Sequence, residues 1–136
     1  MPKLTYEETV YTFDIDFAGH VNNAVYLRWL EEGRTKLLEG CGFPIQELVA
    51  SGTFPVLAHT EIYYKRALFL GDSVRIEGWV SKPSKARIFL DFEVYNQKGE
   101  LAAHAHQTAA FVDGDTMRPR RLTKEEVERL NRFLLP

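Results

Sequence analysis

The chain has 136 residues, a length that suits one domain able to bury a hydrophobic core. Its formal net charge of −2 disfavours a nucleic-acid partner, because contacts to phosphates require a basic surface. The one cysteine excludes an internal disulfide and fits a reducing cytoplasm, and no apolar run approaches the roughly 20 residues of a membrane span. The N-terminus lacks the apolar core of a signal peptide. We therefore expect a single domain, residues 1–136, located in the cytoplasm.

The first part of the chain is predicted to form one strand and one long helix. Residues 5–13 are rich in Thr, Tyr and Val, which favours a strand. In residues 24–38 apolar side chains recur at helical spacing, and Gly33 lies on the apolar face. Asn22 or Asn23 can cap this helix, since its side-chain oxygen accepts a free N–H of the first turn.

The remainder of the chain is predicted to form strands and then a short helix. Alternating polarity or β-branched and aromatic content marks four strands, over residues 56–66, 74–80, 88–94 and 101–112. Thr123 and Glu126 form a capping box that starts a C-terminal helix. We expect the four strands to pair by hairpins, as a meander in an antiparallel sheet.

Only the sheet can cover the apolar face of the long helix, which predicts an α+β fold with an antiparallel sheet wrapped around one long central α-helix. Gly33 costs a helix roughly 1 kcal/mol relative to alanine. Its presence predicts a close approach between helix and sheet at that point. The sheet keeps an unpaired edge, and such edges are commonly covered by another copy of the chain. We therefore expect at least a dimer.

A polar turn, from Asp14 to Asn23, directly precedes the long helix. Its carboxylate Asp16 and its histidine His20 lie beside the free N–H groups of the first helical turn, which carry the positive end of the helix dipole. An acyl-transfer enzyme needs this pairing of a base or nucleophile with donors for an oxyanion. Asp16 can act either as nucleophile or as general base, whereas Asp14 is predicted to stabilise the turn.

Two histidines of the last predicted strand raise the possibility of a metal site. His104 and His106 lie two residues apart, hence on one face, where they could bind a metal together with His59. No cysteine or carboxylate cluster at ligand spacing accompanies them. We therefore interpret them as strand histidines at a surface or interface, and we predict no metal and no cofactor.

A motif begins in the polar turn and continues along the helix. It consists of the stretch from Asp14 to Asn23, then Tyr26, Trp29, Glu31 and Arg34, and later Gly71 with Asp72. This pattern resembles hotdog-fold acyl-CoA thioesterases, and the 4-hydroxybenzoyl-CoA thioesterase-like branch is the nearest. The resemblance implies hydrolysis of acyl-CoA thioesters without a metal, a homodimer or homotetramer, and a site shared between two chains.

The resemblance also implies roles for individual residues. Asp16 matches the catalytic carboxylate of the family, and the backbone N–H near Asn23 matches the donor to the thioester carbonyl. His20 is a further catalytic candidate, because it could orient water or contact the thioester. Candidate substrate-binding residues either belong to the turn and helix start or carry positive charge for coenzyme phosphates. They are Gly19, Asn22, Tyr26, Lys65, Arg66, Lys82, Lys85 and Arg87.

Structural interpretations compete with several of these roles. Gly19 could be simply a turn residue, and the asparagine side chains could simply cap the helix. Tyr26 could simply belong to the core, and the basic residues 65–66 could form a solvated strand end.

Two other functions stay open at this point. The chain could be a hydratase or dehydratase acting on acyl thioesters, or a non-catalytic acyl-CoA-binding module. The sequence also leaves open the acyl group, the choice between coenzyme A and a carrier protein, and the choice between dimer and tetramer. Aromatic residues that could shape an acyl pocket are Phe54, Tyr63, Tyr64 and Phe69.

Overall fold

The computed structural model describes residues 3–81 and 83–134. In chain order the elements are β1 (Leu4–Thr9), the 3₁₀ turn η1 (Thr12–Asp14), α1 (Asn23–Gly40), α2 (Ile45–Ala50), β2 (Thr53–Tyr64), β3 (Ser73–Ser81), β4 (Ile88–Tyr95), β5 (Leu101–Asp113), α3 (Lys124–Leu130) and the 3₁₀ turn η2 (Asn131–Phe133). No helix within these residues combines the length and the apolar character needed to cross a membrane.

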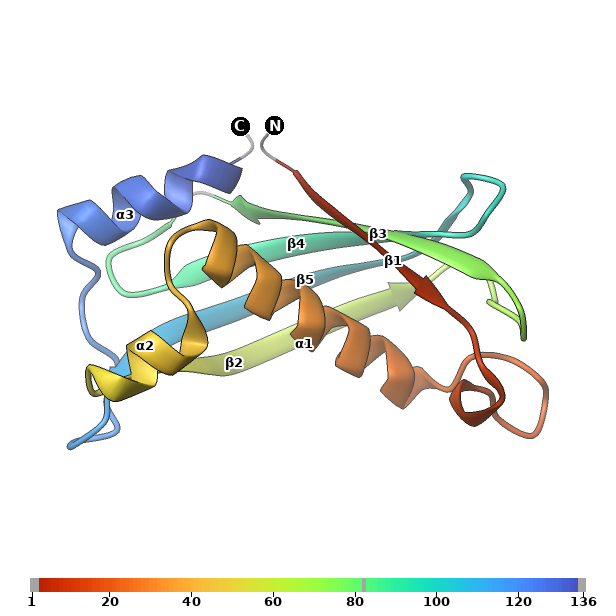
Figure 1. Ribbon diagram of the computed structural model, residues 1–136, viewed down its shortest axis with the longest axis horizontal. Helices are drawn as coiled ribbons and strands as arrows, with labels where there is room; N and C mark the ends of the chain where they lie inside the picture. The colour runs from red at the N-terminus through yellow and green to blue at the C-terminus, as the bar shows by residue number, and fades with distance from the viewer. Residues whose placement is uncertain (1–2, 82, 135–136) are drawn as a thin grey trace.

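The five strands form one antiparallel sheet in the order β1-β3-β4-β5-β2. α1 lies across one face of this sheet (Figure 1). The loop that leads into α1 lies at one end of the sheet, and α2 and α3 lie at the other end (Figure 1). The predicted antiparallel sheet with helices is therefore confirmed.

The predicted meander is wrong for one strand. β3, β4 and β5 are neighbours in chain order, but β2 pairs with β5 instead of β3. β5, with 13 residues, is an inner strand that pairs with β4 along one edge and with β2 along the other. Residues 65–72 then carry the chain from β2 across the end of the sheet to β3, and part of this crossing segment belongs to the site described below.

The core lies between α1 and the covered face of the sheet. The buried residues of α1 form one face of the helix: Val25, Tyr26, Trp29, Leu30, Gly33, Leu37 and Leu38. Residues of β3 and β4 alternate between buried and partly exposed, as expected for strands with one covered face. The apolar helical face predicted from the sequence is therefore confirmed.

Helix and sheet come into close contact at Gly33. A methyl group added to Gly33 would lie 2.7 Å from the ring of Phe92, and one added to Gly78 of β3 would meet the same ring at the same distance. The Tyr6 hydroxyl also lies against Gly33 and donates a hydrogen bond of 2.6 Å to the carbonyl of Trp29. The Phe92 ring thus occupies a slot that exists because both neighbours lack a side chain.

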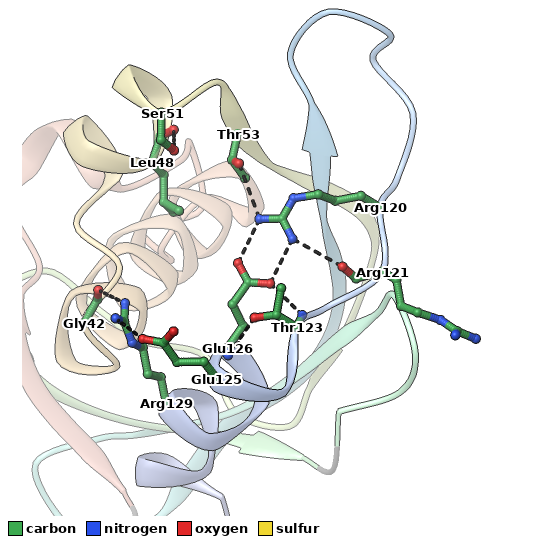
Figure 2. Close-up of polar contacts among 10 residues, drawn as sticks. All are labelled: Gly42, Leu48, Ser51, Thr53, Arg120, Arg121, Thr123, Glu125, Glu126 and Arg129. Carbon is green, nitrogen blue, oxygen red and sulfur yellow. Dashed lines mark hydrogen bonds and ion pairs between the residues drawn. The ribbon is translucent and has the colours of Figure 1, made fainter.

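Figure 2 shows how the C-terminal helix is held. The Arg120 guanidinium donates two hydrogen bonds of 2.8 Å to the Glu126 carboxylate of α3. Arg129 donates to the Glu125 carboxylate at 2.6 Å and to the Gly42 carbonyl at 3.3 Å. The bond from Arg129 to Gly42 attaches α3 to the segment that follows α1, and the Arg120–Glu126 pair attaches α3 to the segment that precedes it.

A carboxyl pair connects β1 with α1. One oxygen of Glu8 is buried and accepts no hydrogen bond from any described residue. Burial, followed by a hydrogen bond to Glu32 and the negative charge of Glu32, raises the pKa of Glu8 to about 7. Two carboxyl groups can share a hydrogen bond only while one of them carries a proton, so this contact between strand and helix depends on pH.

Gly33→Ala tests the close contact. We expect a net loss of about 1–2 kcal/mol in the free energy of unfolding, because overpacking costs about 1–3 kcal/mol and the gain in helix propensity offsets only part of it. Urea unfolding provides the measurement, with Glu39→Ala at an exposed position of α1 as control. Equal stability of Gly33→Ala and wild type would show that the slot tolerates a methyl group.

Glu8→Gln tests the carboxyl pair. The folded pKa of Glu8, about 7, lies above its ordinary value of 4.5, so the stability that the bound proton contributes is complete below pH 4.5 and is lost as the pH rises through 7. The variant should therefore have a higher melting temperature than wild type at pH 8 and a similar one at pH 4.5. Glu7→Gln, which removes an exposed charge from the same strand, should show no such divergence between the two pH values.

Candidate active site

The polar turn before α1 folds as a small hairpin. Ile15 pairs with Val21 in antiparallel fashion, and the Asp16 N–H donates to the His20 carbonyl at 2.8 Å. Val21 is buried, and its N–H donates to the carbonyl of the buried Leu68 at 2.9 Å. The hairpin is thereby fixed against the segment that crosses the end of the sheet.

The Asp16 carboxylate lies at the base of this hairpin and is partly exposed. One oxygen, Oδ1, accepts hydrogen bonds from the Ala18 N–H at 2.9 Å and the His20 N–H at 3.3 Å. No donor among the described residues contacts the other oxygen, Oδ2. The carboxylate is therefore held by one oxygen while the second stays available for chemistry.

Asp14 has a different environment and is 1% exposed. Its Oδ1 accepts a hydrogen bond of 2.8 Å from the Arg28 guanidinium of α1, and its Oδ2 accepts one of 2.9 Å from the Tyr11 N–H. Its carbonyl also accepts from the Asn22 N–H at 2.8 Å. The predicted structural role of Asp14 is confirmed, and the bond to Arg28 adds a link to the helix.

The start of α1 leaves one backbone donor free. The Asn22 side chain caps the helix by accepting from the Ala24 N–H at 2.9 Å, and the Asn22 carbonyl accepts from the Val25 N–H at 2.9 Å. No hydrogen bond among the described residues uses the Asn23 N–H, which is the first N–H of the helix. This group lies where the helix dipole favours negative charge.

A cleft of about 260 Å³ brings most of the predicted site residues together. Its lining consists of Asp16, His20, Val21, Asn23, Tyr26, Tyr64, Lys65, Arg66 and Ala67. All three predicted catalytic residues are in this set, as are three of the predicted substrate-binding residues. The cleft thus joins the hairpin, the first turn of α1, the end of β2 and the beginning of the crossing segment.

Aromatic rings form the less polar side of the cleft. Tyr26 is 4% exposed and its ring meets that of Tyr64 edge to face, with centroids 5.0 Å apart. Burial, with a smaller effect of the neighbouring Tyr64, raises the pKa of Tyr26 to about 12, so its phenol remains protonated at neutral pH. His20 meets the ring of Phe69 edge to face at 5.1 Å, and its ring nitrogens bond to none of the described residues.

The remaining predicted residues lie elsewhere. Gly19 has φ of +80° and its N–H donates to the Asp16 carbonyl at 3.0 Å, which makes it a turn residue outside the cleft lining. Asn22 is likewise occupied as the cap. Lys85 and Arg87 lie in the connection between β3 and β4, at the opposite end of the sheet (Figure 1). Lys82 lies outside the described residues.

Sequence reasoning did not assign Val21 and Ala67 to the site, and it named Tyr64 only as an aromatic that could shape an acyl pocket. Val21 and Ala67 reach the cleft because the hairpin pairs with the crossing segment, and no spacing rule predicts that pairing. Of the other proposed aromatics, Phe54 faces Gly114 and Tyr63 stacks on His104, whereas Phe69 meets His20 but is not part of the cleft lining.

The three strand histidines have other partners. His104 stacks on Tyr63 with centroids 4.8 Å apart, His106 forms a hydrogen bond with Asp91, and His59 bonds to a glutamate at 2.9 Å. In residues 3–81 and 83–134, no group of three or more His, Cys, Asp or Glu is arranged to hold a metal ion.

A hollow of about 280 Å³ between α2 and α3 is a weaker candidate for an active site. Figure 2 shows that four of its charged groups are paired with one another, Arg120 with Glu126 and Arg129 with Glu125. The cleft at Asp16 differs, because it combines an available carboxylate oxygen with an unused N–H at the start of a helix. That combination can activate a nucleophile and stabilise an oxyanion.

The chain is similar to known thioesterases. Residues 10–130 match the family model described as the thioesterase-like superfamily. The putative acyl-CoA thioesterase YneP of Bacillus subtilis is 28% identical over 106 residues, which cover 78% of this chain and 77% of that protein. The long-chain acyl-CoA thioesterase FadM of Escherichia coli is 28% identical over 123 residues, covering 90% and 92% respectively.

A solved structure extends the similarity to three dimensions. The DHNA-CoA thioesterase of Staphylococcus aureus superposes with a TM-score of 0.83 at 26% identity, covering 88% of this chain and 80% of that chain. The family match spans most of the sequence, from the end of β1 to the end of α3. This chain belongs to the thioesterase-like superfamily.

Proposed function

We propose that the protein hydrolyses acyl-CoA thioesters to the free acid and coenzyme A at the cleft beside Asp16. The observation that carries this proposal is the shared lining of that cleft by a carboxylate with a free oxygen and by the first residue of α1. Relatives named as acyl-CoA thioesterases supply the substrate class. The proposed architecture is a single hotdog domain in which the sheet wraps α1.

In the proposed reaction Asp16 acts on the thioester carbonyl in one of two ways. As general base it takes a proton from water while the water oxygen bonds to the carbonyl carbon. As nucleophile its own oxygen forms that bond, giving an anhydride that water then opens. In either case the C–S bond breaks, and the thiolate that leaves is protonated. The two N–H groups that hold Oδ1 would keep Oδ2 aimed in both routes.

The start of α1 would stabilise the oxyanion that forms during attack. The Asn23 N–H has no partner among the described residues, so it can donate to this oxygen without breaking an existing bond. The His20 ring would orient the water or the thioester, and Tyr26 with Tyr64 would line the acyl end. The cleft contributes aromatic surface without fixing the length of the acyl chain.

We also propose a homodimer formed through the β2 edge. β2 is an edge strand of the sheet, and its exposed apolar and aromatic residues are Val56, Leu57, Tyr63 and Tyr64. A two-fold axis across this edge would pair β2 with its copy in antiparallel fashion. The beginning of one β2 would then lie beside the end of the other, so the partner would add the basic residues of its β3–β4 connection to the cleft.

We further propose a cytoplasmic location. The one cysteine, which is buried, is consistent with it.

Asp16→Asn tests the catalytic proposal. Asparagine keeps an oxygen for the two N–H donors, so the hairpin should persist while kcat falls about a hundredfold to ten-thousandfold. Release of free thiol from a panel of acyl-CoA substrates provides the measurement. Loss of the conjugated absorbance of an enoyl-CoA without release of thiol would indicate the hydratase instead.

Asp113→Asn is the matched control for this variant. Asp113 also accepts two backbone N–H groups through one oxygen, from Asp115 at 2.8 Å and Thr116 at 3.3 Å, but it lies at the far end of β5. Its substitution should leave kcat within about twofold of wild type. Equal activity of Asp16→Asn and Asp113→Asn would refute a role for Asp16 in catalysis.

Leu57→Lys tests the dimer. Light scattering should give the wild type at least twice the chain mass of 15.7 kDa, and the variant should shift toward one chain mass, because an edge lysine opposes strand pairing. Val49→Lys changes an exposed apolar residue of α2 in the same way and should not alter the mass. A monomeric wild type would contradict pairing at β2.

A further inference from the structure

Four charged groups lie close together where β1, η1 and α1 meet. Arg28, on the second turn of α1, donates to the Asp14 carboxylate of η1 at 2.8 Å. Glu32 lies one helical turn further along α1, at the spacing where side chains of a helix meet. Glu8 of β1 lies against Glu32, and the charges of Arg28 and Asp14 both act on it. None of the four lines the cleft, so any effect on the proposed reaction acts through other residues.

Asp14 connects Arg28 to both parts of the proposed site. Asp14 lies two residues before Asp16, and its carbonyl accepts from the N–H of Asn22, the cap of α1, at 2.8 Å. Asn23, whose N–H is the proposed oxyanion donor, follows directly. A shift of Asp14 would therefore move the carboxylate and the donor relative to each other, and a misplacement of about 1 Å can cost a hundredfold in rate.

Arg28 can change its partner. Its side chain is 57% exposed, and among the described residues it forms a hydrogen bond only with Asp14. Glu8 has a buried oxygen that accepts no hydrogen bond from any described residue. When Glu8 and Glu32 are both charged, they repel each other and attract a nearby cation, whereas a shared proton weakens that attraction.

The proton of this carboxyl pair is lost near neutral pH, because burial and the contact with Glu32 raise the pKa of Glu8 to about 7. The remaining neighbours of Glu8 do not change charge there. β3 places the apolar Val74 opposite it, and burial raises the pKa of Tyr6 far above the neutral range. The charge of the cluster around Arg28 therefore changes through the pair itself.

We infer that Arg28 is a positioning residue for the proposed hydrolysis and that the Glu8–Glu32 pair controls it, an inference that rests on the proposed thioesterase function. Loss of the shared proton draws Arg28 away from Asp14. The Asp14 carboxylate then keeps one donor, the Tyr11 N–H, and the hairpin is no longer fixed to the start of α1. Hydrolysis slows as the pH rises through 7, although no group that contacts the substrate has to titrate.

Arg28→Gln tests the positioning role. At pH 6.5 we expect kcat to fall about tenfold to a hundredfold while KM stays within about twofold, because Arg28 lies outside the cleft. Arg28→Lys should restore kcat to within about threefold of wild type, since Asp14 needs one charged donor. Arg75→Gln, which breaks an arginine–glutamate pair on β3, is the control and should keep kcat within about twofold. An equal kcat in Arg28→Gln and Arg75→Gln, or no restoration by lysine, would overturn the role.

The pH profile of kcat tests the control by the carboxyl pair. Between pH 6.5 and 8.5 the wild type should lose about threefold to tenfold in kcat, and Glu7→Gln should lose the same. Glu8→Gln should stay within about twofold, because its amide can donate to Glu32 at either pH. An equal decline in Glu8→Gln and wild type would refute the control.

Amide hydrogen exchange separates this inference from the proposed function. The Asn22 N–H reports directly on Asp14, and its protection factor should fall about tenfold between pH 6.5 and 8.5 in the wild type but not in Glu8→Gln. That result supports the inference even if no thioester is hydrolysed, an outcome that would refute only the thioesterase proposal. Hydrolysis with the same protection at both pH values would refute only the control by Glu8 and Glu32.

Discussion

The site depends on the buried carboxylate of Asp14. This group binds the Arg28 guanidinium on the second turn of α1 and the N–H of Tyr11, two residues after β1 ends, so it fixes the helix relative to the segment that leaves the first strand. Loss of Arg28 would leave a buried carboxylate with a single donor, which is costly because a buried charge needs its partners. Since Asp14 also receives the Asn22 N–H through its carbonyl, the same residue sets the place where the helix begins.

Asp14 and Asp16 are two residues apart and illustrate how environment divides the work of identical side chains. Both oxygens of Asp14 are used inside the protein, whereas Asp16 uses one oxygen for the hairpin and leaves the other exposed to the cleft. A structural carboxylate is stabilised by complete hydrogen bonding, and a catalytic one needs an oxygen that substrate or water can reach. The hairpin geometry, and not the residue type, therefore distinguishes the structural carboxylate of Asp14 from the carboxylate for which we propose a catalytic role.

The sequence predicted the local features well, because each had a local cause. The apolar face of α1, the cap at Asn22, the capping box at Thr123 and the close contact at Gly33 all follow from spacing or from the chemistry of one side chain. The position of β2 did not follow, since pairing β2 with β5 or with β3 satisfies the same alternation. For the same reason Ala67 was missed: it reaches the cleft only because the crossing segment pairs with the hairpin.

The distribution of positive charge follows from the same topology. Because β2 lies at the sheet edge, its two ends mark two ends of the molecule: Lys65 and Arg66 follow its last residue, and Lys85 and Arg87 lie near the opposite end. In a dimer built by antiparallel pairing of β2, the opposite end of one subunit lies beside the cleft of the other. In that proposed dimer the basic residues at positions 85 and 87 would lie toward the partner's cleft, while Lys65 and Arg66 line the cleft of their own chain. Each cleft of the proposed dimer would then receive positive charge from both chains, which would favour binding of the proposed anionic substrate by a chain of net charge −2.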